Sequence, residues 1–94
     1  MIPVTLTILD EQGGELATVA GALAIARAPD AWHAPDDPAA VPSHLFHAQA
    51  TAEGLAAGVT VQMGTRRWTI LGEAETSGND PRVTRWQLRE EAIF

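Results

Sequence analysis

The amino-acid sequence predicts an all-β fold, a small barrel or sandwich of about six short strands, and two observations support this prediction. Apolar and polar residues alternate along several short runs, with the period of two that is typical of a half-buried strand. Short clusters rich in Gly, Asp, Asn or Pro separate these runs, as turns do between strands. One stretch, 51–58, favours a helical turn instead, with Thr51 suited to its start and Gly58 to its end.

The clearest strand pattern lies in the second half of the chain. We expect strands over 59–63, 66–73 and 82–89. Trp68 and Trp86 fall on neighbouring strands of this group and supply the largest apolar surface, so we expect the core to form between them. The expected connections are a tight turn at Gly64-Thr65 and a loop over 75–81.

The first half of the chain begins with a predicted hairpin. Its strands cover 4–9 and 15–20, joined by a turn with two glycines. Residues 21–28 are ambiguous, because their alanines favour a helix and the alternation of Leu23 and Ile25 favours a strand. We interpret them as a strand that continues the hairpin. A further short strand is expected over 43–50.

The segment 29–42 holds four prolines, so it fits neither a helix nor a central strand. It is either a disordered surface loop or an arm that orders against a neighbouring chain. In the second interpretation Trp32 is the anchor, since aromatic anchors dominate many interfaces. The candidate interface residues in and after this part of the sequence are Trp32, His33, Asp36 and Asp37, together with a C-terminal pair, Ile93 and Phe94, that either docks on a partner or folds back over the core.

Composition limits the class of protein. The 94 residues form one domain, 1–94, without cysteine and with a net charge of −6. No signal peptide or membrane helix is visible, so we expect a protein made in the cytoplasm with no membrane partner. The negative charge lies in residues 1–53, while 54–94 are balanced, and tight nucleic-acid binding normally needs a basic patch.

No residue pattern predicts an enzyme or a cofactor. His44 and His47 are three apart on an expected strand and therefore face opposite sides, which argues against a shared metal ion with His33. Ser43 precedes His44 directly, and adjacent side chains on a strand diverge, so a nucleophile–base pair is not expected. We expect no enzymatic activity, no cofactor and no metal.

Three arginines on the last expected strand offer a candidate contact surface. Arg82, Arg85 and Arg89 lie mostly on one expected strand and are candidates to line its outer face. They either pair with nearby glutamates of the same chain or meet the acidic half of another copy. The second arrangement is a head-to-tail contact, which closes into a ring when the rotation between copies allows.

A family resemblance appears in the run from Leu55 to Gly72, LAAGVTVQMGTRRWTILG, which resembles the C-terminal half of lambda-like phage head-tail joining proteins. In both, a Leu-x-x-Gly opening precedes a strand, a glycine-containing turn and an aromatic strand. Residues 77–80, SGND, and 86–88, WQL, match the family's Gly/Asp-rich loop and final aromatic strand. The segment 29–42 is the main part of the chain that does not align with the family.

The resemblance implies a structural protein of a phage, a prophage or a gene transfer agent. Such proteins are small β-barrels that assemble as a ring, for which a hexamer or dodecamer is expected, at the head-tail junction. The ring lies between the portal or adaptor and the tail, closes the DNA exit and provides the tail attachment surface. Double-stranded DNA passes through without sequence-specific binding, which a net negative chain suits because acidic walls repel phosphate. The alternatives are a tail terminator or tail-tube component and a free-standing β-barrel binding module.

Overall fold

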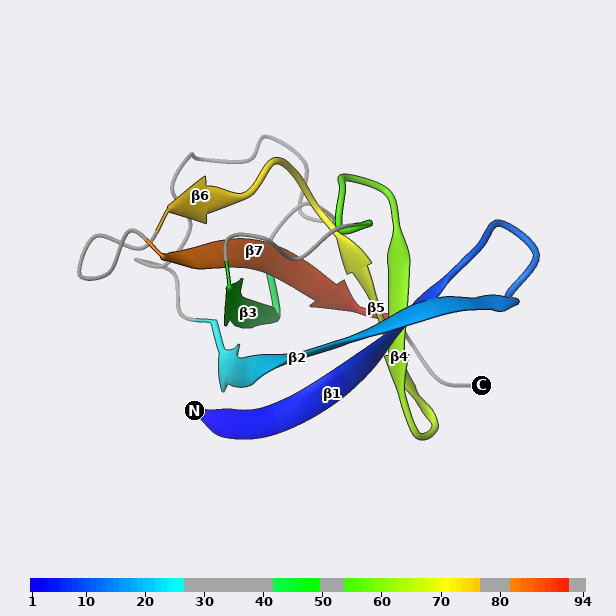
Figure 1. Ribbon diagram of the computed structural model, residues 1–94, viewed down its shortest axis with the longest axis horizontal. Helices are drawn as coiled ribbons and strands as arrows, with labels where there is room; N and C mark the ends of the chain where they lie inside the picture. The colour runs from blue at the N-terminus through cyan, green and yellow to red at the C-terminus, as the bar shows by residue number, and fades with distance from the viewer. Residues whose placement is uncertain (27–41, 50–53, 77–81, 92–94) are drawn as a thin grey trace.

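The computed structural model describes residues 1–26, 42–49, 54–76 and 82–91, and in these residues the protein is an all-β barrel (Figure 1). Seven strands and no helix occur in this part of the chain. The strands are β1 (Ile2–Leu9), β2 (Glu15–Ile25), β3 (His44–Gln49), β4 (Thr60–Met63), β5 (Arg66–Ile70), β6 (Glu75–Thr76) and β7 (Val83–Glu90). The predicted all-β fold class is therefore confirmed.

Six of the strands close into an antiparallel barrel. They follow the order β3-β2-β1-β4-β5-β7, and the pairing of β3 with β7 closes the circle. The short strand β6 adds to the outside of this order by pairing with β7. Strands far apart in the sequence thus lie side by side, and β3 is held between β2 and β7.

The hairpin of β1 and β2 begins the barrel and contains two local features. In its turn, Oδ1 of Asp10 accepts hydrogen bonds from the backbone N–H groups of Gln12 and Gly14, at 2.9 and 2.7 Å. Gly13 takes a positive φ of 83°, a conformation that glycine adopts at little cost. Near the turn the register shifts between Ile8 and Leu9, so that Leu16 is an extra residue on β2.

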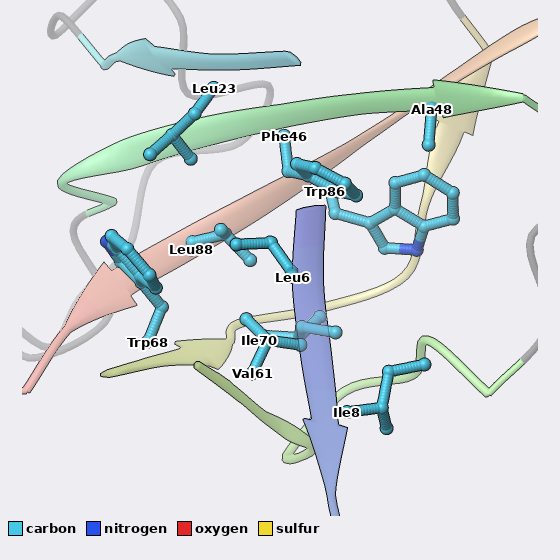
Figure 2. Close-up of a cluster of buried hydrophobic side chains, with 10 residues drawn as sticks. All are labelled: Leu6, Ile8, Leu23, Phe46, Ala48, Val61, Trp68, Ile70, Trp86 and Leu88. Carbon is cyan, nitrogen blue, oxygen red and sulfur yellow. The ribbon is translucent and has the colours of Figure 1, made fainter. Parts of the chain in front are cut away.

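The barrel interior is filled by a cluster of ten apolar side chains (Figure 2). Trp68 is completely buried, and Trp86 packs against Phe46 with 6.2 Å between ring centroids. The predicted core between the two tryptophans is therefore confirmed, and β3 contributes to it as well. The members of the cluster are Leu6, Ile8, Leu23, Phe46, Ala48, Val61, Trp68, Ile70, Trp86 and Leu88.

Three expected elements differ from the structure. The described part of the expected helical turn, 54–58, contains a bend and a turn in place of a helix, because Gly54, inside the expected turn, takes a positive φ of 83°. The strand expected over 66–73 ends at Ile70. Residues 75–76, expected in a loop, form β6, because the adjacent edge of β7 provides pairing partners.

The ambiguous segment after residue 20 continues β2 as a strand as far as Ile25. Leu23 points into the core and pairs with Phe46 across the β2–β3 ladder. Packing in the barrel thus overrides the helical preference of the alanines. The segments 27–41, 50–53, 77–81 and 92–94 lie outside the described residues.

Candidate functional site

Most of the sequence-predicted interface residues lie outside the described part of the chain. These are Trp32, His33, Asp36, Asp37, Ile93 and Phe94, so the arm over 29–42 and the docking tail stay predictions. Arg82, Arg85 and Arg89 are described. Arg82 lies just before β7 and is exposed, while the other two belong to β7.

Arg85 makes the intramolecular pairing that the sequence left open as one alternative. Its Nη2 lies 3.4 Å from Oε2 of Glu75, and the two residues are partners in the β6–β7 ladder. Arg85 and Arg89 share the outer face of β7, opposite the buried Trp86. Gln87 lies between them and is only 4% exposed, so the two arginines do not form a continuous cationic surface.

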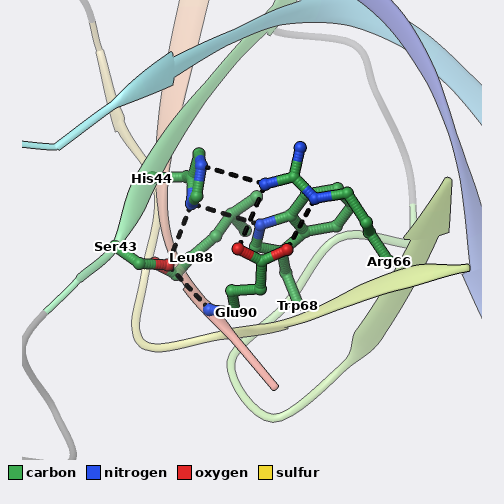
Figure 3. Close-up of polar contacts among 6 residues, drawn as sticks. All are labelled: Ser43, His44, Arg66, Trp68, Leu88 and Glu90. Carbon is green, nitrogen blue, oxygen red and sulfur yellow. Dashed lines mark hydrogen bonds and ion pairs between the residues drawn. The ribbon is translucent and has the colours of Figure 1, made fainter. Parts of the chain in front are cut away.

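The structure brings together a polar network that joins β3, β5 and β7 (Figure 3). Glu90 accepts hydrogen bonds from Nε of Arg66 at 2.6 Å and from Nη2 at 3.1 Å, a bidentate ion pair. The Arg66 guanidinium also lies 5.0 Å from the centroid of the Trp68 ring. The Nε1–H of Trp68 donates to Nδ1 of His44 at 3.3 Å, and the two rings meet edge to face.

The surroundings of His44 favour a neutral imidazole. Its Nδ1 faces the Trp68 N–H donor and the Ser43 hydroxyl, and Nε2 lies 3.4 Å from Nη2 of Arg66. A protonated ring would present donors to these donor groups. Burial lowers the pKa of His44 below its ordinary value of 6.5, the Glu90 carboxylate partly opposes this shift, and Arg66 adds to it.

The ion pair shifts the pKa values of its two partners in opposite directions. The hydrogen bond that Arg66 donates to the Glu90 carboxylate holds the pKa of Glu90 below its usual value of 4.5, although burial of the carboxylate acts in the opposite direction. The same bond raises the pKa of Arg66. The Arg66 and Glu90 side chains remain 41% and 28% exposed, so solvent screens their attraction.

Ser43 and His44 do not diverge as the sequence predicted, since Nδ1 of His44 lies 2.9 Å from the Ser43 hydroxyl oxygen. The other hydrogen bonds of this pair favour a structural role. The Ser43 hydroxyl oxygen accepts the backbone N–H of Glu90 at 2.7 Å, and the hydroxyl also lies 3.4 Å from the Leu88 carbonyl oxygen. The Glu90 carboxylate is bonded to Arg66 and has no hydrogen bond to His44. The network therefore lies where β3 and β5 meet β7 and ties these strands together.

Sequence reasoning missed this network, because its members are separated by up to 47 positions. The only local signal was the adjacent Ser43 and His44. The expectation that His44 and His47 face opposite sides of β3 is confirmed. The His44 ring contacts the buried Trp68, whereas His47 is the ladder partner of Arg85, which lies on the outer face of β7. Within the described ranges, no group of three or more potential metal ligands occurs.

A second feature is the incomplete pairing of the β1–β2 hairpin. β1 pairs with β4 only over Thr7–Leu9, and β2 pairs with β3 only over Ala22–Ile25. In the described part of the chain, the rest of each strand pairs only with the other strand of the hairpin. The large hydrophobic residues that are exposed in the described ranges all lie on or beside this hairpin: Met1, Ile2, Leu16 and Ile25.

Comparison of the chain with protein-family models, with curated proteins and with solved structures gives no significant match. The part of the chain that the structure describes has no helix of the length and apolar character needed to cross a lipid bilayer.

Proposed function

We propose that this chain is a structural subunit of a phage-like head-tail connector, in which copies form a ring that closes the DNA exit and provides the surface for tail attachment. The observation that carries the proposal is a small closed barrel whose first hairpin leaves two strand edges unpaired among the described residues. Unpaired edges are a liability for an isolated protein and serve as contact surfaces in an assembly.

Two further features support the same function. The run from Leu55 to Gly72 resembles head-tail joining proteins, and its strand–turn–strand order corresponds to β4 and β5. The net charge of −6 suits a conduit through which DNA slides, because a wall with excess carboxylates repels the phosphate backbone.

The proposal is tested by purifying a tagged copy from the producing cells and identifying the recovered proteins by mass spectrometry. We expect portal or adaptor proteins together with tail proteins. Recovery of tail-tube proteins alone would support a tail terminator or tube component instead. Recovery of one cellular regulator without particle proteins would refute the connector and support a free-standing binding module.

The purification needs a control for non-specific capture of abundant particle proteins. An equally tagged unrelated small barrel, produced at the same level, serves this purpose. Electron microscopy of particles from cells that lack this chain provides an independent readout. We expect filled or leaking heads without attached tails, and tailed particles with normal infectivity would contradict the proposal.

A further inference from the structure

The structure points to a specific contact between copies: we infer that the free edge of β2 in one copy pairs with the free edge of β1 in the next copy. The contact is a β-strand addition in which main-chain hydrogen bonds continue the sheet from one barrel to its neighbour. The inference deepens the proposed function and rests on it for the ring geometry. The pairing of the two edges is tested separately below.

The two free edges are of similar length and lie toward opposite ends of the hairpin, so neighbouring copies pair with an offset along the strands. Among the described residues, β2 is free on its outer edge over 15–21, because β3 pairs only with Ala22–Ile25. β1 is free over 2–6, because β4 pairs only with Thr7–Leu9. The side chains of residues 15–18 are all exposed, and among the described strands none pairs with that edge. Figure 1 shows the hairpin extending past β4, which leaves its turn end clear of the other strands.

The two edges carry few of the charges that usually protect an exposed strand. Residues 2–6 are uncharged, and Glu15 is the only charged residue in 15–21. Natural edge strands discourage association with lysines, prolines or bulges. This hairpin has one proline on β1, Pro3, and the bulge at Leu16, so its protection is partial.

Each free edge also presents one large aliphatic side chain that is exposed. Ile2 on β1 is 67% exposed, and Leu16 on β2 is 65% exposed. Ile2 has the same orientation as the core residues Leu6 and Ile8 along the strand, yet lies outside the buried cluster. A neighbouring strand at each edge would remove both side chains from water.

A second copy is the occupant that these observations favour, because one chain supplies both halves of the contact. β1 and β2 of one hairpin are antiparallel. When the hairpins of two copies lie side by side in the same orientation, β1 of the second copy therefore runs antiparallel to β2 of the first. Each copy then uses two different surfaces, which is the heterologous arrangement that closes into rings. A contact of five residues spans roughly 17 Å and is small for a stable dimer, so we expect weak association in solution that ring closure strengthens.

The test uses charge substitutions at the two exposed aliphatic residues. Ile2→Lys blocks the β1 edge, and Leu16→Lys blocks the β2 edge. Ile25→Lys is the matched control, because Ile25 is 76% exposed and lies on the part of β2 that already pairs with β3. Sedimentation equilibrium over a wide range of protein concentration measures association, and thermal melts followed by circular dichroism verify the fold of each variant.

We expect the wild-type chain and the Ile25→Lys variant to associate as concentration rises, and each edge variant to associate about tenfold more weakly or worse. An equal mixture of Ile2→Lys and Leu16→Lys should form a one-to-one dimer, since one intact β2–β1 contact remains. A wild-type chain that stays monomeric throughout, edge variants that associate normally, or a mixture that fails to pair would each overturn the inference.

Hydrogen exchange of the wild-type chain provides a measurement that needs no variant. Amides in 15–21 should exchange more slowly as protein concentration rises, and unchanged rates would count against the contact.

The purification of tagged copies from producing cells separates the contact between copies from the proposed connector function. Edge variants that still enter particles would refute the contact and leave the connector function intact. Wild-type association without any recovered particle protein would refute the function and leave the contact intact.

Discussion

Replacing Gly21 by alanine tests how tightly β2 is held against β3. A Cβ at this position would meet the backbone carbonyl oxygen of His47 and would lie 2.6 Å from Cζ of Phe46. The carbonyl belongs to the ladder in which Ala22 pairs with His47, so it cannot move without breaking strand pairing. Phe46 is 1% exposed and packed in the core, so its ring has no free space to enter.

The magnitude follows from the cost of adding a methyl group to a closely packed site. Overpacking by extra methylenes destabilises proteins by about 1–3 kcal/mol, and we expect Gly21→Ala at the upper end because neither neighbour can yield. A loss of about 3 kcal/mol lowers Tm by roughly 12–24 °C in a domain of this size. Urea unfolding followed by tryptophan fluorescence measures the free energy of unfolding directly, since Trp68 and Trp86 are core residues.

Gly72→Ala is the matched control for this substitution. A Cβ at Gly72 meets nothing within 4 Å, and Gly72 is not among the described glycines with positive φ. We therefore expect a neutral effect or a gain of about 0.4–1 kcal/mol from the reduced entropy of the unfolded chain. If Gly21→Ala were as stable as Gly72→Ala, the close approach of β2 to Phe46 and His47 would be wrong.

Two further predictions concern the network at His44. Because the pKa of His44 is lowered in the folded state, the unfolded chain takes up the proton first as the pH falls, and the stability present above pH 6.5 is lost as the pH falls through the folded pKa. The variant His44→Gln should flatten this part of the curve of unfolding free energy against pH, measured by urea titrations at several pH values. An unchanged curve would contradict the assignment. Arg66→Ala should lower the free energy of unfolding by about 0.5–1.5 kcal/mol, since solvent partly screens the ion pair with Glu90. The control Arg67→Ala, at an exposed residue, should change it by no more than about 0.5 kcal/mol. Equal effects of the two substitutions in thermal melts would refute a special role for Arg66.

Local patterns sufficed to predict the strands, because burial on one face imposes a period of two. Val61 and Leu6 point inward as the alternation indicated, and both are completely buried. The exceptions arise from tertiary contacts. Residues 75–76 have no strand pattern of their own and become β6 because β7 offers an open edge beside them. Thr51 and Gly58 suited the start and the end of a helical turn over 51–58, yet the positive φ at Gly54, inside the expected turn, breaks the helical path.

The candidate site was less accessible to sequence reasoning than the fold. Ser43, Arg66 and Glu90 become neighbours only because β7 pairs with both β3 and β5, and no local pattern indicates that closure. The arginines of β7 were predicted as a group from their alternation. The burial of Gln87 between Arg85 and Arg89, which separates them, depends on three-dimensional packing.

The β1–β2 hairpin connects the fold to the proposed assembly. Its strands meet the rest of the barrel at opposite ends, β1 over Thr7–Leu9 and β2 over Ala22–Ile25. Among the described residues, this closure leaves the other edges of the hairpin, 2–6 on β1 and 15–21 on β2, without a strand partner. These edges are already extended and held by each other, so a neighbouring strand would find them preorganised and would pay little ordering entropy. The topology that closes one barrel therefore also leaves the two edges through which we expect copies to join.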